Sequence, residues 1–313
     1  FNTHIGTAFN QNLSDVACVS CGQCIVVCPT GALAEKDNTK DVWRALGDPT
    51  KHVIVQTAPS IRVTLGEAFG MHIGTNVEGK MVAALRRLGF DGVYDTDFAA
   101  DMTIVEEANE LVERIKNGGK LPMITSCSPG WVKYCEHYYP EFTENLSTCK
   151  SPQQMFGALA KTWYAEKTGI DPKDIFVVGI MPCTAKKFET KREDESASGY
   201  PDVDVALTTR ELARMIERAG MYLPKLPDEE FDAPLGTSTG AGVIFGATGG
   251  VMEAALRTAH YMLTGRDPEP DAFNIVRAKS GDFGVTEAEI TIAGATVKAA
   301  VVSGLGNTKR LID

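Results

Sequence analysis

Two cysteines stand directly after runs of apolar residues. Residues 175–181 lead into Cys183, and Lys186 follows three residues after it. Residues 120–124 lead in the same way into Cys127. Open α/β sheets place their chemistry outside the carboxyl ends of buried strands. We therefore expect two loops, each following a strand, that hold a metal cofactor between sheet ends.

A third group of cysteines has the spacing C-x2-C-x2-C-x3-C and is followed by proline: Cys18, Cys21, Cys24 and Cys28. In bacterial ferredoxins the first three thiolates of such a run bind one 4Fe-4S cluster, and the fourth binds a partner cluster. The alternative is a zinc site, whose four ligands usually come as two separated pairs. The spacing favours the iron-sulfur cluster. The missing fourth ligand, and a cluster for the last cysteine, are expected upstream of Phe1.

The composition indicates a globular protein without nucleic-acid binding. The chain has 313 residues, of which 43% are hydrophobic, enough to bury a sizeable core. Its net charge of -10 disfavours binding to phosphate backbones, which needs clustered Lys and Arg. No apolar run approaches the roughly 18 to 20 residues of a membrane span. The eight cysteines, without a secretory segment, indicate a reducing compartment. We expect no membrane span and a cytoplasmic location.

Hydrophobic periodicity predicts the elements that position these cysteines. The expected strands cover 52–60, 92–94, 120–124, 174–181, 272–278, 287–292 and 296–302, and the expected helices cover 80–88, 102–116, 151–168, 251–263 and 307–313, with a strand and then a helix within 202–220. The glycine-dense residues 240–250 fit no phosphate-binding pattern and are expected to bring the backbone close to a buried cofactor. Since the chain starts without methionine and ends inside an expected helix, we expect it to be part of a longer protein.

Several residues have an unremarkable structural interpretation when they are considered alone. Glu107, Glu110 and Arg114 lie three and four residues apart, hence on one helix face, which is usually solvated. Cys135 and Cys149 are expected to be small buried apolar residues. The five histidines show no paired ligand spacing and receive no role.

The two cysteine loops resemble signature motifs of the FeFe hydrogenases. Residues 125–131, TSCSPGW, resemble the family's TSCCPxW, and residues 181–189, MPCTAKKFE, match its MPCxxKxxE at every fixed position. The resemblance covers nearly the whole chain. It implies a two-lobed α/β domain with mixed or parallel sheets over 51–313, and a partial ferredoxin-like segment over 1–50. The implied activity is reversible reduction of protons to hydrogen at an H-cluster, a cubane cluster joined to a two-iron unit with CO, cyanide and dithiolate ligands.

The resemblance also implies a role for individual residues. Cys183 becomes a ligand of the cubane, Lys186 a donor to a cyanide, and Cys127 the thiol that passes protons to the open iron. Four further residues line the proton relay: Glu107, Glu110, Ser147 and Glu189. Six match the pocket wall: Pro59, Ser60, Gln153, Met181, Phe245 and Gly246. Electrons are expected to arrive through the N-terminal cluster from a ferredoxin or from electron-transfer subunits, with a flavin subunit linked to NAD(P)H as one candidate.

The sequence departs from the family pattern at two places. Ser128 stands where the family has a cysteine ligand of the cubane, so a hydroxyl or water replaces a thiolate there, unless Ser128 is simply a helix N-cap. The third motif, which supplies the last two cysteine ligands, is absent from residues 1–313, so we expect this chain to hold the H-cluster poorly. Two alternatives follow: a hydrogen-sensing or electron-relay subunit, and an iron-sulfur assembly protein of the same fold, against which Lys186 argues.

Overall fold

The computed structural model describes residues 6–13, 15–276 and 284–313. Its centre is a four-stranded parallel sheet in the order β2-β1-β3-β4. The strands are β1 (His52–Thr57), β2 (Gly92–Asp95), β3 (Ile175–Met181) and β4 (Val205–Thr208). Because all four run the same way, their carboxyl ends meet at one edge of the sheet, and the loop of Cys183 begins there.

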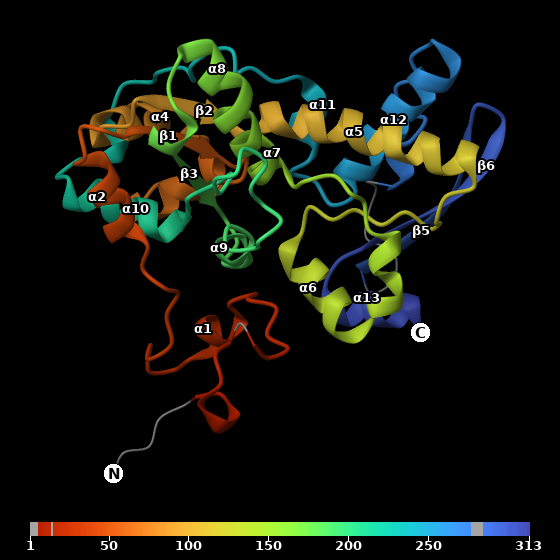
Figure 1. Ribbon diagram of the computed structural model, residues 1–313, viewed down its shortest axis with the longest axis horizontal. Helices are drawn as coiled ribbons and strands as arrows, with labels where there is room; N and C mark the ends of the chain where they lie inside the picture. Colours follow the sequence, from red (N-terminus) through yellow and green to blue (C-terminus); the bar gives the residue numbers. More distant parts are fainter. Residues whose placement is uncertain (1–5, 14, 277–283) are drawn as a thin grey trace.

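Helices cover both faces of this sheet, because successive strand residues point to opposite sides. On one face Val55 and Ile180 pack against α2 (Thr39–Leu46), α4 (Glu78–Leu88) and α10 (Thr209–Arg218). On the other face Ile54 and Val177 pack against Phe156 of α7 (Pro152–Leu159). All of these strand side chains are fully buried. The result is a three-layer α/β/α arrangement (Figure 1).

One long helix, α5 (Thr96–Asn117), extends from this sheet to a second lobe (Figure 1). Asp95 begins it as an N-cap whose side chain accepts from the amide of Asp97. Near its other end, Ala108 packs with Ala259 of α12 (Gly250–Thr264). The second lobe also contains an antiparallel hairpin of β5 (Val285–Ile292) and β6 (Ala295–Val302), followed by α13 (Leu305–Ile312). The predicted α/β class and the two lobes are confirmed.

The remaining helices are short: α1 (Gln23–Val27), α3 (Ile61–Thr64), α6 (Pro129–Tyr138), α8 (Ala165–Thr168), α9 (Ala185–Glu189) and α11 (Gly240–Ile244). A π turn at Ala160–Tyr164 joins α7 to α8, within the single helix predicted over 151–168. The described part of the N-terminal segment, which contains α1, lies near α9 and adds no strand to the sheet (Figure 1). Its cysteine run therefore lies on the side of the molecule that carries the Cys183 loop.

Two predicted strands are wrong. Residues 120–124 form only an isolated parallel bridge between Ile124 and Leu146. Residues 119–122 are exposed, so no buried face supports a strand there, and Pro122 has no amide to donate. Within 272–276, Asn274–Val276 form a 3-10 turn that buries Val276; residues 277 and 278 of that predicted strand lie outside the described residues.

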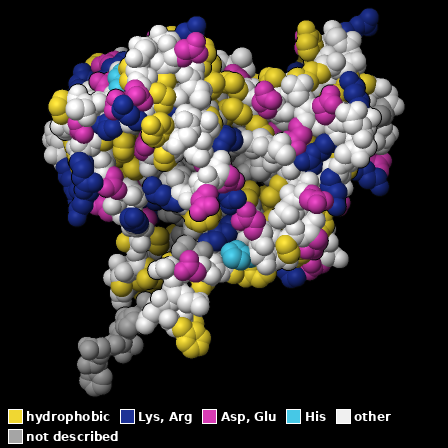
Figure 2. Space-filling model, viewed as in Figure 1, with side chains coloured by type: hydrophobic (Ala, Val, Ile, Leu, Met, Phe, Trp, Pro, Cys, Tyr) yellow, Lys and Arg dark blue, Asp and Glu magenta, His cyan; other side chains and the backbone are white. Residues whose placement is uncertain are grey.

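Other predicted elements are present, with shifted ends. The helix predicted over 102–116 begins six residues earlier, because Asp95 caps it there. The helices α2 and α11 were not predicted, and each is eight residues or shorter. Among the described residues, no helix combines the length and apolar character that crossing a bilayer requires. Acidic and basic side chains are interspersed over the face drawn in Figure 2.

Candidate functional site

The Cys183 loop continues the central strand of the sheet. Strand β3 pairs with β1 up to Thr57 and Ile180, and the amide of Ala58 then donates to the carbonyl of Ile180 at 3.0 Å. This pairing brings Pro59 and Ser60, which follow β1, to the same edge as Met181, the buried last residue of β3. Three residues of the predicted pocket wall therefore lie at the edge from which Cys183 projects.

Lys186 joins the two cysteine loops. Its Nζ donates to the carbonyl of Cys127 at 2.9 Å and to both carboxylate oxygens of Glu189, at 3.0 and 3.1 Å. The ammonium thus uses its three protons inside the site. Glu189 is 3% exposed and also accepts from Nε2 of Gln153 at 2.8 Å. The predicted residues Lys186, Glu189, Gln153 and Cys127 are therefore brought together.

Gln56, which was not predicted as a site residue, supports the backbone of Gln153. Gln56 is fully buried in β1, and its Nε2 donates to the backbone carbonyl of Gln153 at 2.8 Å. Its Oε1 accepts from the hydroxyl of Thr96 at 3.0 Å. A polar residue inside an otherwise apolar strand was the available signal, because a buried amide must find hydrogen-bond partners.

The thiol of Cys127 lies beside a buried carboxyl group. The hydroxyl of Thr125 is 3.6 Å from Sγ of Cys127 and donates to Oε1 of Glu107 at 2.8 Å. Burial raises the pKa of the Cys127 thiol, as does Glu107, while the ammonium of Lys186 opposes the shift. Burial likewise raises the pKa of Glu107, against hydrogen bonds from Thr125 and Ser147. Both groups therefore hold their protons more tightly than in water.

The polar chain continues from Glu107 to Glu110. Ser147 lies between the two carboxyl groups: its hydroxyl donates to Oε2 of Glu110 at 2.8 Å, and it lowers the pKa of Glu107. The guanidinium of Arg114 donates to Oε1 of Glu110 at 2.6 Å, and the amide of Thr148 adds bonds of 3.0 and 3.2 Å. Glu107, Glu110 and Arg114 thus lie on an inner face of α5. Their interpretation from helical spacing alone, as a solvated face, is wrong.

Arg114 also holds the segment that carries Cys127. Its guanidinium donates to the carbonyls of Lys120, Asn145 and Leu146 at 3.1, 3.1 and 2.7 Å. The side chain of Asn145 donates to the carbonyl of Pro122 at 2.7 Å. These bonds replace the strand pairing that the segment lacks. Helical spacing placed Arg114 on the face of Glu107 and Glu110 but predicted no function for it.

Ser128 occupies the N-cap position of α6. Its backbone is extended and its carbonyl accepts from the amide of Val132 at 3.0 Å, but its side chain makes no capping hydrogen bond. Cys135 is fully buried in the same helix, as predicted, and Sγ donates to the carbonyl of Tyr139 at 3.4 Å. Cys149 is half-buried, and burial raises its pKa to about 12. Ser128 is thus placed at the start of a helix with its hydroxyl uncommitted.

Phe245 and Gly246 follow α11, which packs on α5 away from the Cys183 edge (Figure 1). Their amides donate to the carbonyls of Gly242 and Val243 within this turn. The glycines here do allow close backbone approach, because a Cβ on Gly242 would lie 2.7 Å from the carbonyl oxygen of Asp97. That approach is to α5. The roles of Phe245 and Gly246 in a pocket wall stay predictions.

The N-terminal cysteines are accessible. Cys21 and Cys24 are exposed, and Cys18 and Cys28 are half-buried. A hydrogen bond with Thr30 lowers the pKa of Cys28 to about 7, which favours the thiolate. In the described part of the chain, no three or more Cys, His, Asp or Glu side chains already converge as a metal site. The four roles as cluster ligands stay predictions.

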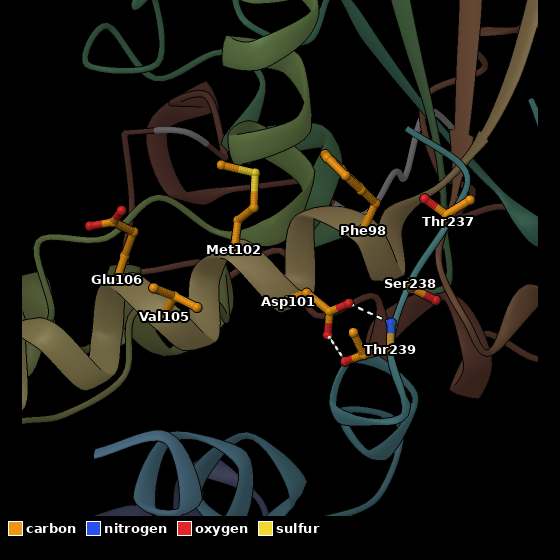
Figure 3. Close-up of a pocket in the computed structure, with 8 residues that line it drawn as sticks. All are labelled: Phe98, Asp101, Met102, Val105, Glu106, Thr237, Ser238 and Thr239. Carbon is orange, nitrogen blue, oxygen red and sulfur yellow. Dashed lines mark hydrogen bonds between the residues drawn. The ribbon is translucent and has the colours of Figure 1, made fainter. Parts of the chain in front are cut away.

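A cavity of about 430 Å³ lies elsewhere, on the outer side of α5. Figure 3 shows it between Phe98, Met102 and Val105 of α5 and the strand-like residues 237–239. Asp101 closes one end, accepting from the amide and hydroxyl of Thr239 at 2.6 and 2.7 Å. None of the residues predicted from the sequence to act in catalysis or cofactor binding lines this cavity.

The site lies at the carboxyl edge of a parallel sheet in an α/β fold, where the Cys183 loop begins. Lys186 connects this loop to the loop of the second cysteine, Cys127. The family model for the iron only hydrogenase large subunit, C-terminal domain, matches residues 51–313. The chain belongs to this family.

Individual relatives agree with that assignment. The chain is 51% identical to the NADP-reducing hydrogenase subunit HndD of Solidesulfovibrio fructosivorans, over 100% of this chain and 54% of that protein. It is 50% identical to the periplasmic Fe hydrogenase large subunit of Nitratidesulfovibrio vulgaris, over 87% of this chain and 65% of the relative. A solved apo variant of the FeFe hydrogenase HydA1 from Chlamydomonas reinhardtii superposes with a TM-score of 0.76 at 38% identity, covering 88% and 78% of the two chains. The chain thus spans only part of its curated relatives.

Proposed function

We propose that this chain forms the catalytic part of an FeFe hydrogenase, which reversibly converts two protons and two electrons into H2. One observation carries the proposal: a row of hydrogen-bonding side chains leads from Cys127 through Thr125, Glu107 and Ser147 to Glu110. Such a row suits proton transfer, which needs exchangeable groups at hydrogen-bond spacing. It starts beside Lys186 and the Cys183 loop, where the family's cofactor motifs lie.

The residues present fit an H-cluster in part. Cys183 offers a soft thiolate at the sheet edge, and the buried Oε1 of Gln153 has no hydrogen-bond partner among the described residues. The hydroxyl of Ser128 is a harder donor than the thiolates that iron-sulfur clusters prefer. Cys183 is thus the one cysteine ligand of the cubane that the two motifs in this chain provide. When bound, the H-cluster supplies the electrons and the open iron at which protons become hydrogen.

The chain's own residues then hold and move protons. Cys127 carries the proton nearest the pocket, and the hydroxyl of Thr125 connects its thiol to Glu107. The raised pKa of Glu107 lets that carboxyl carry a proton at higher pH than an exposed glutamate. Glu110, held by the guanidinium of Arg114, exchanges the proton through the hydroxyl of Ser147. Lys186 and Glu189 fix the carbonyl of Cys127 and so orient the thiol.

Electrons are proposed to arrive through a 4Fe-4S cluster on Cys18, Cys21 and Cys24. The relative HndD is named as a subunit of an NADP-reducing hydrogenase, which supports an NADP-linked electron-transfer partner. We further propose a cytoplasmic location from the cysteine content. One relative is periplasmic, so fractionation of cells that express the chain tests this directly.

A second function, hydrogen sensing or electron relay without turnover, is favoured by Ser128. Infrared spectroscopy after anaerobic maturation separates the two. CO and cyanide bands would support the hydrogenase, whereas iron-sulfur clusters without those bands would favour the relay.

Replacing Cys127 by alanine tests the proton row. We expect hydrogen evolution from dithionite-reduced methyl viologen to fall by at least about 100-fold, since a positioned acid or base contributes that much. Cys135→Ala is the matched control, because this thiol is buried within α6, the helix that follows the Cys127 loop, and its removal should leave the rate nearly unchanged. Normal turnover in Cys127→Ala, with intact infrared bands, would contradict the assignment.

A further inference from the structure

The loop that carries Cys21 touches the loop that carries Cys183. The hydroxyl of Thr184 donates to the carbonyl of Ser20 at 2.5 Å, in a partly buried position. Ser20 directly precedes Cys21, and Thr184 directly follows Cys183. One hydrogen bond therefore joins the chain neighbours of two predicted cluster ligands that lie more than 160 residues apart.

The backbone of the N-terminal loop is shaped around Thr184. Ser20 has a φ of 58° and Gly22 a φ of 76°, so the chain is left-handed on both sides of Cys21. Few residues other than glycine adopt this conformation. A Cβ on Gly22 would lie 3.0 Å from Oγ1 and 3.5 Å from Cγ2 of Thr184. Gly22 is thus required both by its φ and by the closeness of Thr184.

Neighbouring contacts keep this part of the N-terminal segment against the same two loops. The carbonyl of Val19 lies 3.5 Å from where a Cβ on Gly130 would stand, directly after the Cys127 loop. Nζ of Lys187, in α9, donates to the carbonyl of Lys36 at 2.6 Å. The N-terminal segment thus lies against both cysteine loops, and the hydrogen bond of Thr184 is the one that these contacts give to the cysteine run itself.

We propose that Thr184 is a positioning residue for electron transfer, whose hydroxyl holds the Cys21 loop against the Cys183 loop. The path between the two cysteines then consists of covalent bonds and one hydrogen bond. Cys18, Cys21 and Cys24 would hold the electron-donating cluster and Cys183 the accepting group, and transfer of one electron between them would form and break no bond. The electron comes from an external reductant. This role rests on the proposed function, because both clusters must be bound.

Hydrogen exchange of the full chain tests the contact without any cluster. Thr184→Val keeps the shape and loses the donor. In this variant the amides of Ile25 and Val26, which donate to the carbonyl of Gly22 at 3.0 and 3.4 Å, should exchange about fivefold to tenfold faster, the effect of one lost hydrogen bond. Thr184→Ser keeps the hydroxyl and should exchange like the natural chain. Unchanged exchange in Thr184→Val, or equal exchange in both variants, would overturn the positioning role.

A pair of glycine variants separates the contact from backbone strain. Gly22→Ala and Gly31→Ala both place a side chain at positive φ, 76° and 64°, but nothing lies within 4 Å of a Cβ on Gly31. Only Gly22→Ala should speed exchange at the amides of Ile25 and Val26. The same increase in Gly31→Ala would mean that strain, and not Thr184, holds the loop.

The electron-transfer part is tested by EPR of the iron-loaded, dithionite-reduced full chain. Magnetic coupling between the two reduced clusters should broaden the spectrum of the natural chain and of Thr184→Ser, and weaken in Thr184→Val. Coupling that is absent from the natural chain, or equal in all three, would overturn the proposal. Missing CO and cyanide bands would instead count against the proposed hydrogenase function, since neither the exchange nor the coupling depends on the two-iron unit.

Discussion

The two cysteine loops reach the same site but are held by different forces. The Cys183 loop extends β3, whose backbone is paired on both sides and whose Ile180 is fully buried. The Cys127 loop has a single bridge, Ile124 to Leu146, and depends on side-chain hydrogen bonds from Arg114. Apolar burial thus positions one cysteine, and a polar clamp positions the other. The same apolar-run-to-cysteine pattern in the sequence can therefore arise from two different structures.

The largest effect on stability is expected in β3, whose apolar burial positions the Cys183 loop. Ile180→Ala removes a fully buried side chain from the core and leaves a cavity, so we expect a loss of about 4 kcal/mol in the free energy of unfolding. Urea denaturation measures it. Ile73→Ala is the control, because Ile73 is 88% exposed and should change stability by less than about 0.5 kcal/mol. Equal losses would mean that burial in β3 does not stabilise the sheet edge.

The Cys127 loop should lose its polar support in Arg114→Met, which keeps the bulk of the side chain and removes the guanidinium. Arg114 and Glu110 are only 12% and 16% exposed, so breaking their pair should cost about 3 kcal/mol. Iodoacetamide should also label Cys127 faster while Cys183 keeps its rate. Arg87→Met is the control, since that side chain is 41% exposed. Equal acceleration at both cysteines would show that the loops are not held independently.

The smallest effect concerns pH and the buried Glu107. Its pKa is raised above the ordinary 4.5 because burial disfavours the charge, so the folded chain binds this proton more tightly than the unfolded chain. Its ionisation therefore lowers stability as pH rises above about 4.5. Glu107→Gln should lose that dependence, so that its advantage over the natural chain grows with pH.

Glu106→Gln provides the matched control for this profile. Glu106 is the exposed neighbour on the same helix, and its removal should leave the pH dependence of unfolding parallel to that of the natural chain. Parallel profiles for Glu107→Gln as well would show that Glu107 is not held at a raised pKa.

Most elements of the fold were predictable because burial leaves a period in the sequence. The apolar run of β3 and the helix ending at Gly89 carry that signal, and both are present. Residues 120–124 show an apolar run that resembles a buried strand, but Leu121 and Pro122 are exposed. The short helix α11 has no helical period in its sequence, because its glycines have no side chains to mark a buried face. Periodicity thus reports burial and not strand pairing itself.

The site was predictable where a motif fixes spacing and less so where partners come from afar. Lys186 and Glu189 meet because they lie three residues apart on α9. Gln56 and Arg114 were missed as supports because each acts on backbone carbonyls distant in the chain. No local pattern encodes such a bond. The helix face of Glu107 and Glu110 was judged correctly only through the family resemblance.

The length of α5 has a mechanical consequence. At a rise of about 1.5 Å per residue, its 22 residues form a strut of about 33 Å that is packed against α7 of the sheet lobe and against α12 of the second lobe. Because α5 packs against both lobes, any change in the angle between the lobes must either bend this helix or move it relative to α7 or α12. Glu107 and Glu110 lie on this one helix, so the distance between their backbones does not depend on the angle between the lobes, whereas Thr125 and Ser147 come from other segments. A change in that angle would therefore act on the proton row at these two hydroxyls and not between the two carboxyls.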